Sequence, residues 1–216
     1  MKTLFNKKPN GKTILVVAEC QEGALKAGRF ALKHLYEKQT RVVLLQTYKA
    51  PKFGLSGIRD LTSILKKISK EDLTTLKNTL IQEFCIPADN ILKLAIEGNL
   101  STIAQQEFRH YDNLSIVIGT DCTPLYSKNP YNQIFSLMTT GIRPIYIVDD
   151  FISLIDRTKI IVISEKVEDL PERFKNFLFS ISNKDKIPVE YLTEKNKTWA
   201  PISKENKHYF LNEVLE

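Results

Sequence analysis

The sequence predicts an α/β fold: an open, doubly wound parallel sheet of five strands, followed by a partial second β-α-β unit. Short apolar runs rich in Val and Ile recur along the chain, and such nearly continuous runs are typical of strands buried on both faces of a parallel sheet. Apolar residues at helical spacing lie between these runs. Alternating strands and helices with right-handed crossovers give an open parallel sheet. With 216 residues, the chain is long enough to bury such a core without disulfides.

The five strands of the first unit are expected to be the five apolar runs before residue 150. In chain order they are Thr13–Ala18, Arg41–Tyr48, Ile91–Glu97, Leu114–Gly119 and Pro144–Val148. Ligands of such sheets bind beyond the carboxyl ends of the strands, where the strand order reverses. The residues that follow the first and fourth strands are therefore expected to form the site.

Helices are expected between these strands. The first carries a stripe of small and apolar residues that would let it approach the sheet closely, formed by Ala24, Gly28, Ala31 and Leu35. The next segment holds two apolar stripes, one from Leu61 to Ile68 and one from Leu73 to Phe84. Ser69 followed by Asp72 resembles a new N-cap, so this segment is either one helix or two.

Two further helices complete the first unit. Asn99 is expected to cap the third helix, which bears Leu100, Ile103, Ala104 and Phe108. Asn129 and Pro130 are a suitable cap and first position for the fourth, which bears Ile134, Leu137 and Met138.

A weak internal repeat begins after Val148. Sliding the chain by 146 positions, which moves Ile14 onto Ile160, also moves Val43 onto Val189. The helix expected between them has an apolar face of Leu170, Phe174, Phe177, Leu178 and Ile181. We therefore divide the chain into a first α/β domain, residues 1–150, and a truncated second repeat with a helical tail, residues 151–216. A lone β-α-β unit cannot bury both faces of its strands, so it must pack on the first domain or on another subunit.

The composition favours a cytoplasmic protein without a membrane segment. No apolar run approaches the roughly 20 residues needed to cross a bilayer, and the first residues do not resemble a secretory signal. The net charge of +6 raises the hypothesis of an RNA-associated basic protein. Lysines occur in ones and twos with acids nearby, however, which favours a solvated surface over a nucleic-acid-binding stripe. Cys20, Cys85 and Cys122 lack metal-ligand spacing and are interpreted as reduced thiols.

From Thr13 to Val148 the first domain resembles the universal stress protein family. The resemblance lies in "ILVVAECQEGALKAGRFAL", "IEGNLSTIAQQEFRHYDNLSIVIGT" and "RPIYIV". It implies an adenine nucleotide alpha hydrolase-like, Rossmann-like fold. It also implies a homodimer or tandem pseudo-dimer, often joined through the final strand of each domain. The chain looks like the tandem plan with its second copy cut down.

Many members of this family bind ATP through a loop that reads Gly-x-x-Gly, nine residues, then Gly-Ser or Gly-Thr. Gly119 fits the first position, Cys122 stands at the second glycine, and Asn132 and Gln133 stand at the last pair. The adenine-side acid of the family is replaced by Glu19. The resemblance therefore implies a vestigial nucleotide crevice formed by Ala18, Glu19, Gly119, Thr120, Cys122, Asn132 and Gln133.

The lost glycines predict lost ATP binding. Glycine lets phosphate oxygens approach successive backbone N–H groups, and a β-carbon at Cys122 both strains a left-handed turn and occupies that space. Two lost charge-assisted hydrogen bonds, at roughly 1.5 to 3 kcal/mol each, would lower the affinity by about two to four powers of ten. We therefore expect a non-enzymatic, dimeric interaction or regulatory protein with no cofactor and no metal.

Alternative hypotheses remain open at this stage. The chain could bind or hydrolyse a nucleotide through Gly119, Thr120 and the amide side chains of Asn132 and Gln133. Glu19 and Asp121 could converge as an acid–base pair or a magnesium site, although solvated loop acids are the simpler interpretation. Two further alternatives are a redox pair formed by Cys20 and Cys122, and a crevice filled by the aromatic side chains of Tyr126, Tyr131, Phe135 and Tyr146.

Overall fold

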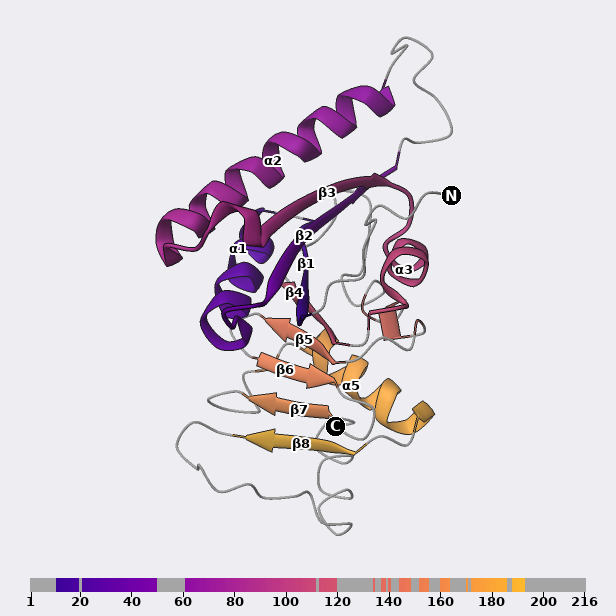
Figure 1. Ribbon diagram of the computed structural model, residues 1–216. Helices are drawn as coiled ribbons and strands as arrows, with labels where there is room; N and C mark the ends of the chain where they lie inside the picture. The colour runs from indigo at the N-terminus through magenta and orange to yellow at the C-terminus, as the bar shows by residue number, and fades with distance from the viewer. Residues whose placement is uncertain are drawn as a thin grey trace.

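Eight strands in the described part of the chain form one sheet, in the order β3-β2-β1-β4-β5-β6-β7-β8 (Figure 1). The computed structural model describes residues 11–19, 21–49, 61–111, 113–119, 134, 137–138, 140, 144–148, 152–155, 160–163, 170, 172–185 and 188–192. The predicted α/β class, with a mostly parallel sheet flanked by helices, is confirmed.

The first five strands are parallel and lie where the sequence predicts them. They are β1 (Thr13–Val17), β2 (Arg41–Tyr48), β3 (Ile91–Glu97), β4 (Leu114–Gly119) and β5 (Ile145–Val148). β1 pairs with β2 on one side and with β4 on the other, so that Leu15 lies between Val43 and Ile116. The strand order therefore reverses between β1 and β4, as expected.

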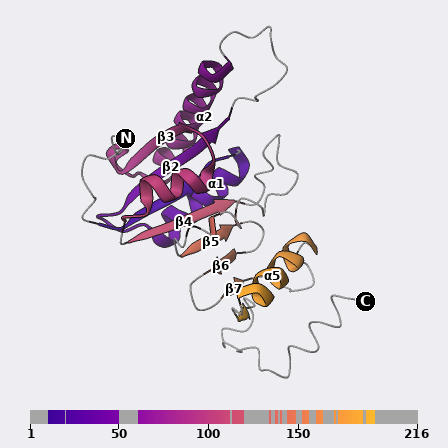
Figure 2. The same cartoon turned by 90° about the vertical axis from the view of Figure 1, so that its right-hand side faces the viewer.

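Helices cover both faces of this sheet (Figures 1 and 2). One face carries α1 (Gln21–Phe30), its π-helical continuation η1 (Ala31–Leu35) and α2 (Leu61–Phe84). The other carries α3 (Leu100–Ile103), its π-helical continuation η3 (Ala104–Phe108), the helical residues Ile134, Leu137 and Met138, and α5 (Glu172–Asp185). A short 3₁₀ turn, η2 (Ala88–Asn90), precedes β3. Side chains of alternating strand residues fill the core on each face.

The long segment before β3 is one helix, α2, rather than two. Ser69, the proposed new N-cap, is buried in its middle, and Leu73 and Leu80 continue the buried stripe beyond it. The earlier apolar stripe is largely not buried, because Ile64 and Ile68 are each 47% exposed. Continuous burial of the second half holds α2 together where local capping chemistry suggests a break.

Asn99 precedes α3 at the N-cap position, but its side chain makes no capping hydrogen bond. Its backbone oxygen instead accepts a hydrogen bond from the backbone N–H of Ile103, at 3.0 Å. The proposed cap of the fourth helix, Asn129 with Pro130, lies outside the described residues.

The second unit continues the same sheet through a strand that the sequence analysis did not predict. This strand, β6 (Ile152–Ile155), is antiparallel to both β5 and β7 (Ile160–Ile163). β8 (Val189–Leu192) is parallel to β7. Ile160 pairs with Val189, whereas its counterpart Ile14 pairs with Val42, so the two β-α-β units differ in register by one residue.

α5 packs the second unit onto the core of the first. Its apolar face includes Phe174 and Phe177, which belong to the same buried cluster as Leu15 and Phe108. β5 is hydrogen-bonded on both sides, to β4 and to β6. A second copy of the chain therefore has no free edge at β5, the strand through which the family resemblance implies that domains join.

Candidate functional site

A small cavity opens beyond the carboxyl ends of β1 and β2, where α1 and α2 converge. It has a volume of about 140 Å³. Its lining residues come from α1, β2, α2 and the β1–α1 connection: Ala18, Glu19, Gln21, Ala24, Leu25, Gln46, Asp72, Leu73, Thr75, Leu76 and Thr79. Ala18 and Glu19 are the predicted crevice residues that this cavity contains.

Glu19 is held at the end of β1 by the neighbouring strand β2. Its Oε1 accepts hydrogen bonds from the Thr47 hydroxyl, at 2.7 Å, and from the Thr47 backbone N–H, at 3.3 Å. Burial raises the pKa of the Glu19 carboxyl above its ordinary value, because desolvation disfavours the charged form more than the two Thr47 hydrogen bonds stabilise it. The side chain is thus fixed in place and partly removed from water.

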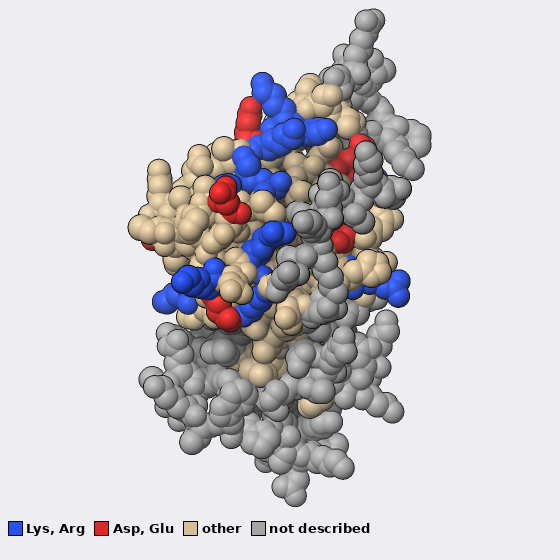
Figure 3. Space-filling model, viewed as in Figure 1, with Lys and Arg blue, Asp and Glu red and all other residues tan. Residues whose placement is uncertain are grey.

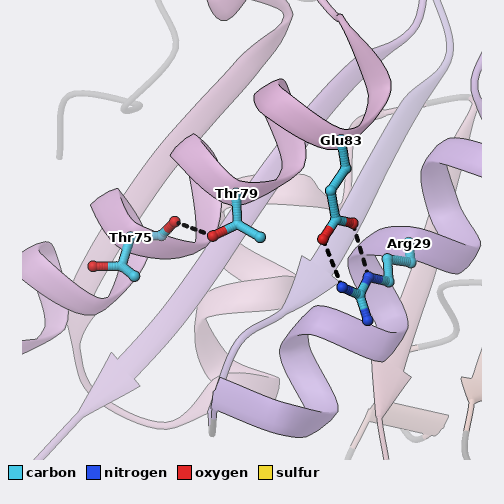
Figure 4. A network of polar contacts seen from close by, with 4 residues as sticks. All are labelled: Arg29, Thr75, Thr79 and Glu83. Carbon is cyan, nitrogen blue, oxygen red and sulfur yellow. Dashed lines mark hydrogen bonds and ion pairs between the residues drawn. The ribbon is translucent and has the colours of Figure 1, made fainter.

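Other polar groups of the cavity come from β2 and α2. The Gln46 Oε1 atom is buried and accepts no hydrogen bond from the described residues. Asp72 Oδ1 accepts a hydrogen bond from Gln21 Nε2, at 3.1 Å. The Thr75 hydroxyl donates to the carbonyl oxygen of Glu71 within the same helix. The Thr79 hydroxyl donates to the carbonyl oxygen of Thr75 (Figure 4). These side chains present acceptor oxygens beside the apolar walls.

The position of α1 depends on a close approach at Gly119, the last residue of β4. A Cβ on Gly119 would overlap the carbonyl oxygen of Gly23 and lie 2.6 Å from its Cα atom. The first turn of α1 therefore rests backbone to backbone on the end of β4. Gly119 does not line the cavity, and packing alone explains its identity.

α1 also packs closely against α2. A Cβ on Gly28 would lie 2.7 Å from Leu80 Cδ1, so this glycine serves the contact between the helices rather than the predicted approach to the sheet. Nearby, the Arg29 guanidinium donates to both carboxylate oxygens of Glu83, at 2.8 and 2.6 Å (Figure 4). These two contacts fix the separation of the helices that wall the cavity.

The rest of the predicted crevice is not placed. Thr120, Cys122, Asn132 and Gln133 lie outside the described residues, as do Asp121 and Cys20. Of the aromatic residues proposed to fill the crevice, Tyr146 is described. Its ring lies 5.5 Å from that of Phe30 at the last residue of α1, and it is absent from the cavity lining.

Sequence reasoning missed the contribution of α2. Asp72 was interpreted only as part of an N-cap, and Gln46 as an ordinary strand residue. The available signal was the polar row Asp72, Thr75 and Thr79, whose spacing places them beside the buried Leu73 and Leu76. Such a row inside a core-facing helix segment marks a place where the helix borders a polar space.

Other site types find no support in the described ranges. They contain no group of three or more His, Cys, Asp or Glu side chains that could hold a metal ion. Nor do they include a helix long and apolar enough to cross a membrane. On the face in Figure 3, basic side chains form separate groups with acidic side chains beside them, rather than a continuous stripe.

The fold and the cavity define an α/β protein with a small cavity of mixed polar and apolar lining at the carboxyl ends of its strands. No protein-family model matches the sequence, and neither does any curated protein. Similar solved structures include a protein from the universal stress protein family of Burkholderia pseudomallei, at 15% identity over 63% of this chain and 95% of that one, with a TM-score of 0.48.

Two more similar structures are the hypothetical protein MJ0577 and a universal stress protein in complex with cAMP. The first has 16% identity over 63% of this chain and 94% of that one, with a TM-score of 0.47. The second has 13% identity over 64% and 97%, with a TM-score of 0.41. At such low identities and TM-scores, these similarities assign neither a family nor a ligand to the chain.

Proposed function

We propose that this chain is a non-catalytic protein of the universal stress type, with a regulatory or interaction role, that has lost ATP binding. In this proposal the β1 end of the nucleotide crevice persists as a small binding cavity, and the phosphate end is lost. The observation that carries it is the position of the cavity, which contains Ala18 and Glu19 but not Gly119.

The packing at β4 supports the loss of the phosphate end. The first turn of α1 occupies the space beside Gly119, so the α1 side of this residue offers no opening for an anion. Past that point the sequence places side chains at Cys122 and Asn132, where a phosphate would need bare backbone.

The chemistry of the cavity supports a binding role. Its titratable lining residues are the two carboxylates Glu19 and Asp72, with no His, Cys or Lys among them. Thr75 and Thr79 donate their hydroxyl protons to helix carbonyls, and among the described residues no side-chain base is hydrogen-bonded to either hydroxyl. This set lacks the activated nucleophile that covalent catalysis needs.

We also propose that the protein is a cytoplasmic homodimer. Because β5 is paired on both sides within the chain, the dimer would use another surface, such as the outer edge of β3 or of β8. Sedimentation equilibrium of the full chain tests this: a dimer is expected, and a monomer at high micromolar concentration would contradict it.

The main test is a search for bound and bindable nucleotide. We expect mass spectrometry of the protein as purified to show no stoichiometric ATP, ADP or AMP. We also expect calorimetry with millimolar ATP and magnesium to give no saturable heat, and no phosphate release above that of buffer. A stoichiometric nucleotide would overturn the proposal.

The same titration separates the rival function, a protein that binds or hydrolyses nucleotide through a non-standard loop. The buried acid Glu19 and the adjacent cavity, on the side of the crevice where the resemblance places adenine, favour keeping this rival. Saturable ATP heat that disappears in Asn132→Leu but persists in Asn78→Leu, on α2 outside the cavity, would establish it.

A further inference from the structure

Two carboxylates of the cavity keep hydrogen-bond acceptors without a donor in the described part of the chain. Glu19 Oε1 accepts from Thr47, and among the described residues no donor reaches its Oε2. Asp72 accepts from Gln21 through Oδ1, and its other oxygen has no donor among these residues. A buried acceptor without a donor costs free energy, so a ligand with N–H groups would gain by completing this set.

The cavity also carries negative charge without a compensating cation. Two of its lining residues, Glu19 and Asp72, are acids, and none is Lys or Arg. Within the described residues neither acid forms an ion pair, although other carboxylates of the two helices do, such as Glu83 with Arg29. A partly buried carboxylate is stabilised when a cation with hydrogen-bond donors lies beside it.

The walls favour an organic cation over a metal ion. Ala18, Ala24, Leu25, Leu73 and Leu76 supply apolar surface to the same space. Calcium and magnesium require six or more oxygen ligands or waters, and an aliphatic wall provides none. A short alkyl chain would instead remove these side chains from water.

We propose that the cavity binds a small organic cation, a primary alkylammonium, through the carboxylates of Glu19 and Asp72. Its ammonium group donates to the Glu19 Oε2 atom, with Asp72 as the second anionic partner. Its short chain lies against Leu25, Leu73 and Leu76. This inference deepens the proposed function and rests on it in placing the retained binding space at the β1 end of the crevice.

The test uses n-butylammonium chloride and the full chain, by calorimetry at constant ionic strength and neutral pH. Three comparison compounds separate the contributions. n-Butanol keeps the chain and removes the charge, n-butyltrimethylammonium keeps the chain and the charge and removes the N–H donors, and n-butylguanidinium replaces the head group. We expect saturable binding of n-butylammonium, and binding about tenfold or more weaker for n-butanol and n-butyltrimethylammonium.

Two variants locate the site. Glu19→Gln keeps an acceptor for Thr47 and removes the charge, and it should weaken n-butylammonium binding by about tenfold to a hundredfold. Glu71→Gln removes one charge from an exposed position on α2 outside the cavity, and it should leave the affinity unchanged. Circular dichroism and the unfolding midpoint of each variant verify that it is folded before its affinity is compared.

Nitrogen-15 NMR locates the bound ligand, because a general effect of charge would not shift the amide signals of the cavity residues alone. The amide signals of Gln46, Thr47 and Thr75 should shift on titration. Those of Gln39 and Thr40, which precede β2 at the opposite end of the strands, should not. Equal binding of n-butanol, undiminished binding to Glu19→Gln, or the absence of saturable binding would each overturn the inference. Absent ATP and absent alkylammonium binding would defeat this inference alone, whereas bound ATP would defeat the proposed function.

Discussion

The carboxyl ends of β1 and β4 are neighbours in the sheet, yet helix α1 packs tightly against one and leaves a cavity at the other. At β4, the first turn of α1 rests directly on Gly119 and leaves no space. At β1, the side chains of that turn and of α2 stand apart and enclose a cavity around Glu19. A crevice at a reversal of strand order can therefore be closed at one strand and open at the next, depending on where small residues allow backbone contact.

The closed end is the more sensitive of the two. Gly119→Ala should lower the free energy of unfolding by about 3 kcal/mol or more, because the new Cβ meets backbone atoms that no rotamer change can move. Urea unfolding of both proteins measures this difference. A loss below about 1 kcal/mol would mean that α1 moves off β4 at little cost, and the contrast between the two ends would disappear.

The contact between α1 and α2 should respond less. In Gly28→Ala the new Cβ meets the flexible end of Leu80, and the helix gains about 1 kcal/mol from the better propensity of alanine. We expect a net loss of about 1 kcal/mol. A double-mutant cycle with Leu80→Val checks the cause, since the smaller side chain should relieve part of the loss. Additive effects of the two substitutions would exclude this contact as the reason.

The protein should become more stable when the charge of Glu19, in the cavity at the end of β1, is removed. Because the pKa of Glu19 is raised in the folded protein, the ionised carboxyl disfavours folding at neutral pH, and Glu19→Gln should be at least as stable as the parent there. As the pH falls through the folded-state pKa of Glu19 toward 4.5, the parent should recover this difference. Denaturant unfolding of both proteins across this pH window measures the effect. A difference that grows as the pH falls would contradict the assignment.

The smallest effect on stability is expected for the ion pair between Arg29 on α1 and Glu83 on α2. Arg29 holds the pKa of the Glu83 carboxyl below its ordinary value, so their contribution to stability is present above pH 4.5 and is lost as the pH falls through the folded-state pKa. Arg29→Gln should lower stability slightly, and by less at high salt, because both side chains are partly exposed. Carbon-13 NMR titration should show the pKa of Glu83 rising in the variant. An unchanged pKa would show that the ion pair does not form in solution.

The sequence was sufficient to predict the first five strands because most residues of β1, β2, β4 and β5 are buried, although β3, at the edge of the sheet, is only partly buried. A short run of Ile, Leu and Val such as Ile14–Val17 is typical of a buried strand. The predicted strand boundaries agree with those of the structure to within one residue. It was insufficient for β6, since the four residues Ile152–Ile155 are too few to show a period and follow the apolar run of β5 after only three residues.

The site was predictable only where it follows a strand. Glu19 could be placed because the end of β1 was known, and the reversal of strand order makes that position significant. Asp72 could not, because its proximity to Glu19 depends on how α2 lies across the sheet, which no local pattern specifies. Gln46 could not, because its proximity to Glu19 depends on the register between β1 and β2. Gly119 shows the converse limit: its spacing matches a phosphate loop, while its Cα atom faces the backbone of Gly23.

The single strand that runs against all others also determines which way the two halves of the molecule face. Two copies related by a twofold axis across paired antiparallel strands would direct their crevices to opposite ends. Here β6 is antiparallel to both of its neighbours, β5 and β7. Strands β7 and β8 therefore run in the same direction as β1 to β5. The carboxyl ends of β7 and β8 therefore lie at the same end of the sheet as the Glu19 cavity.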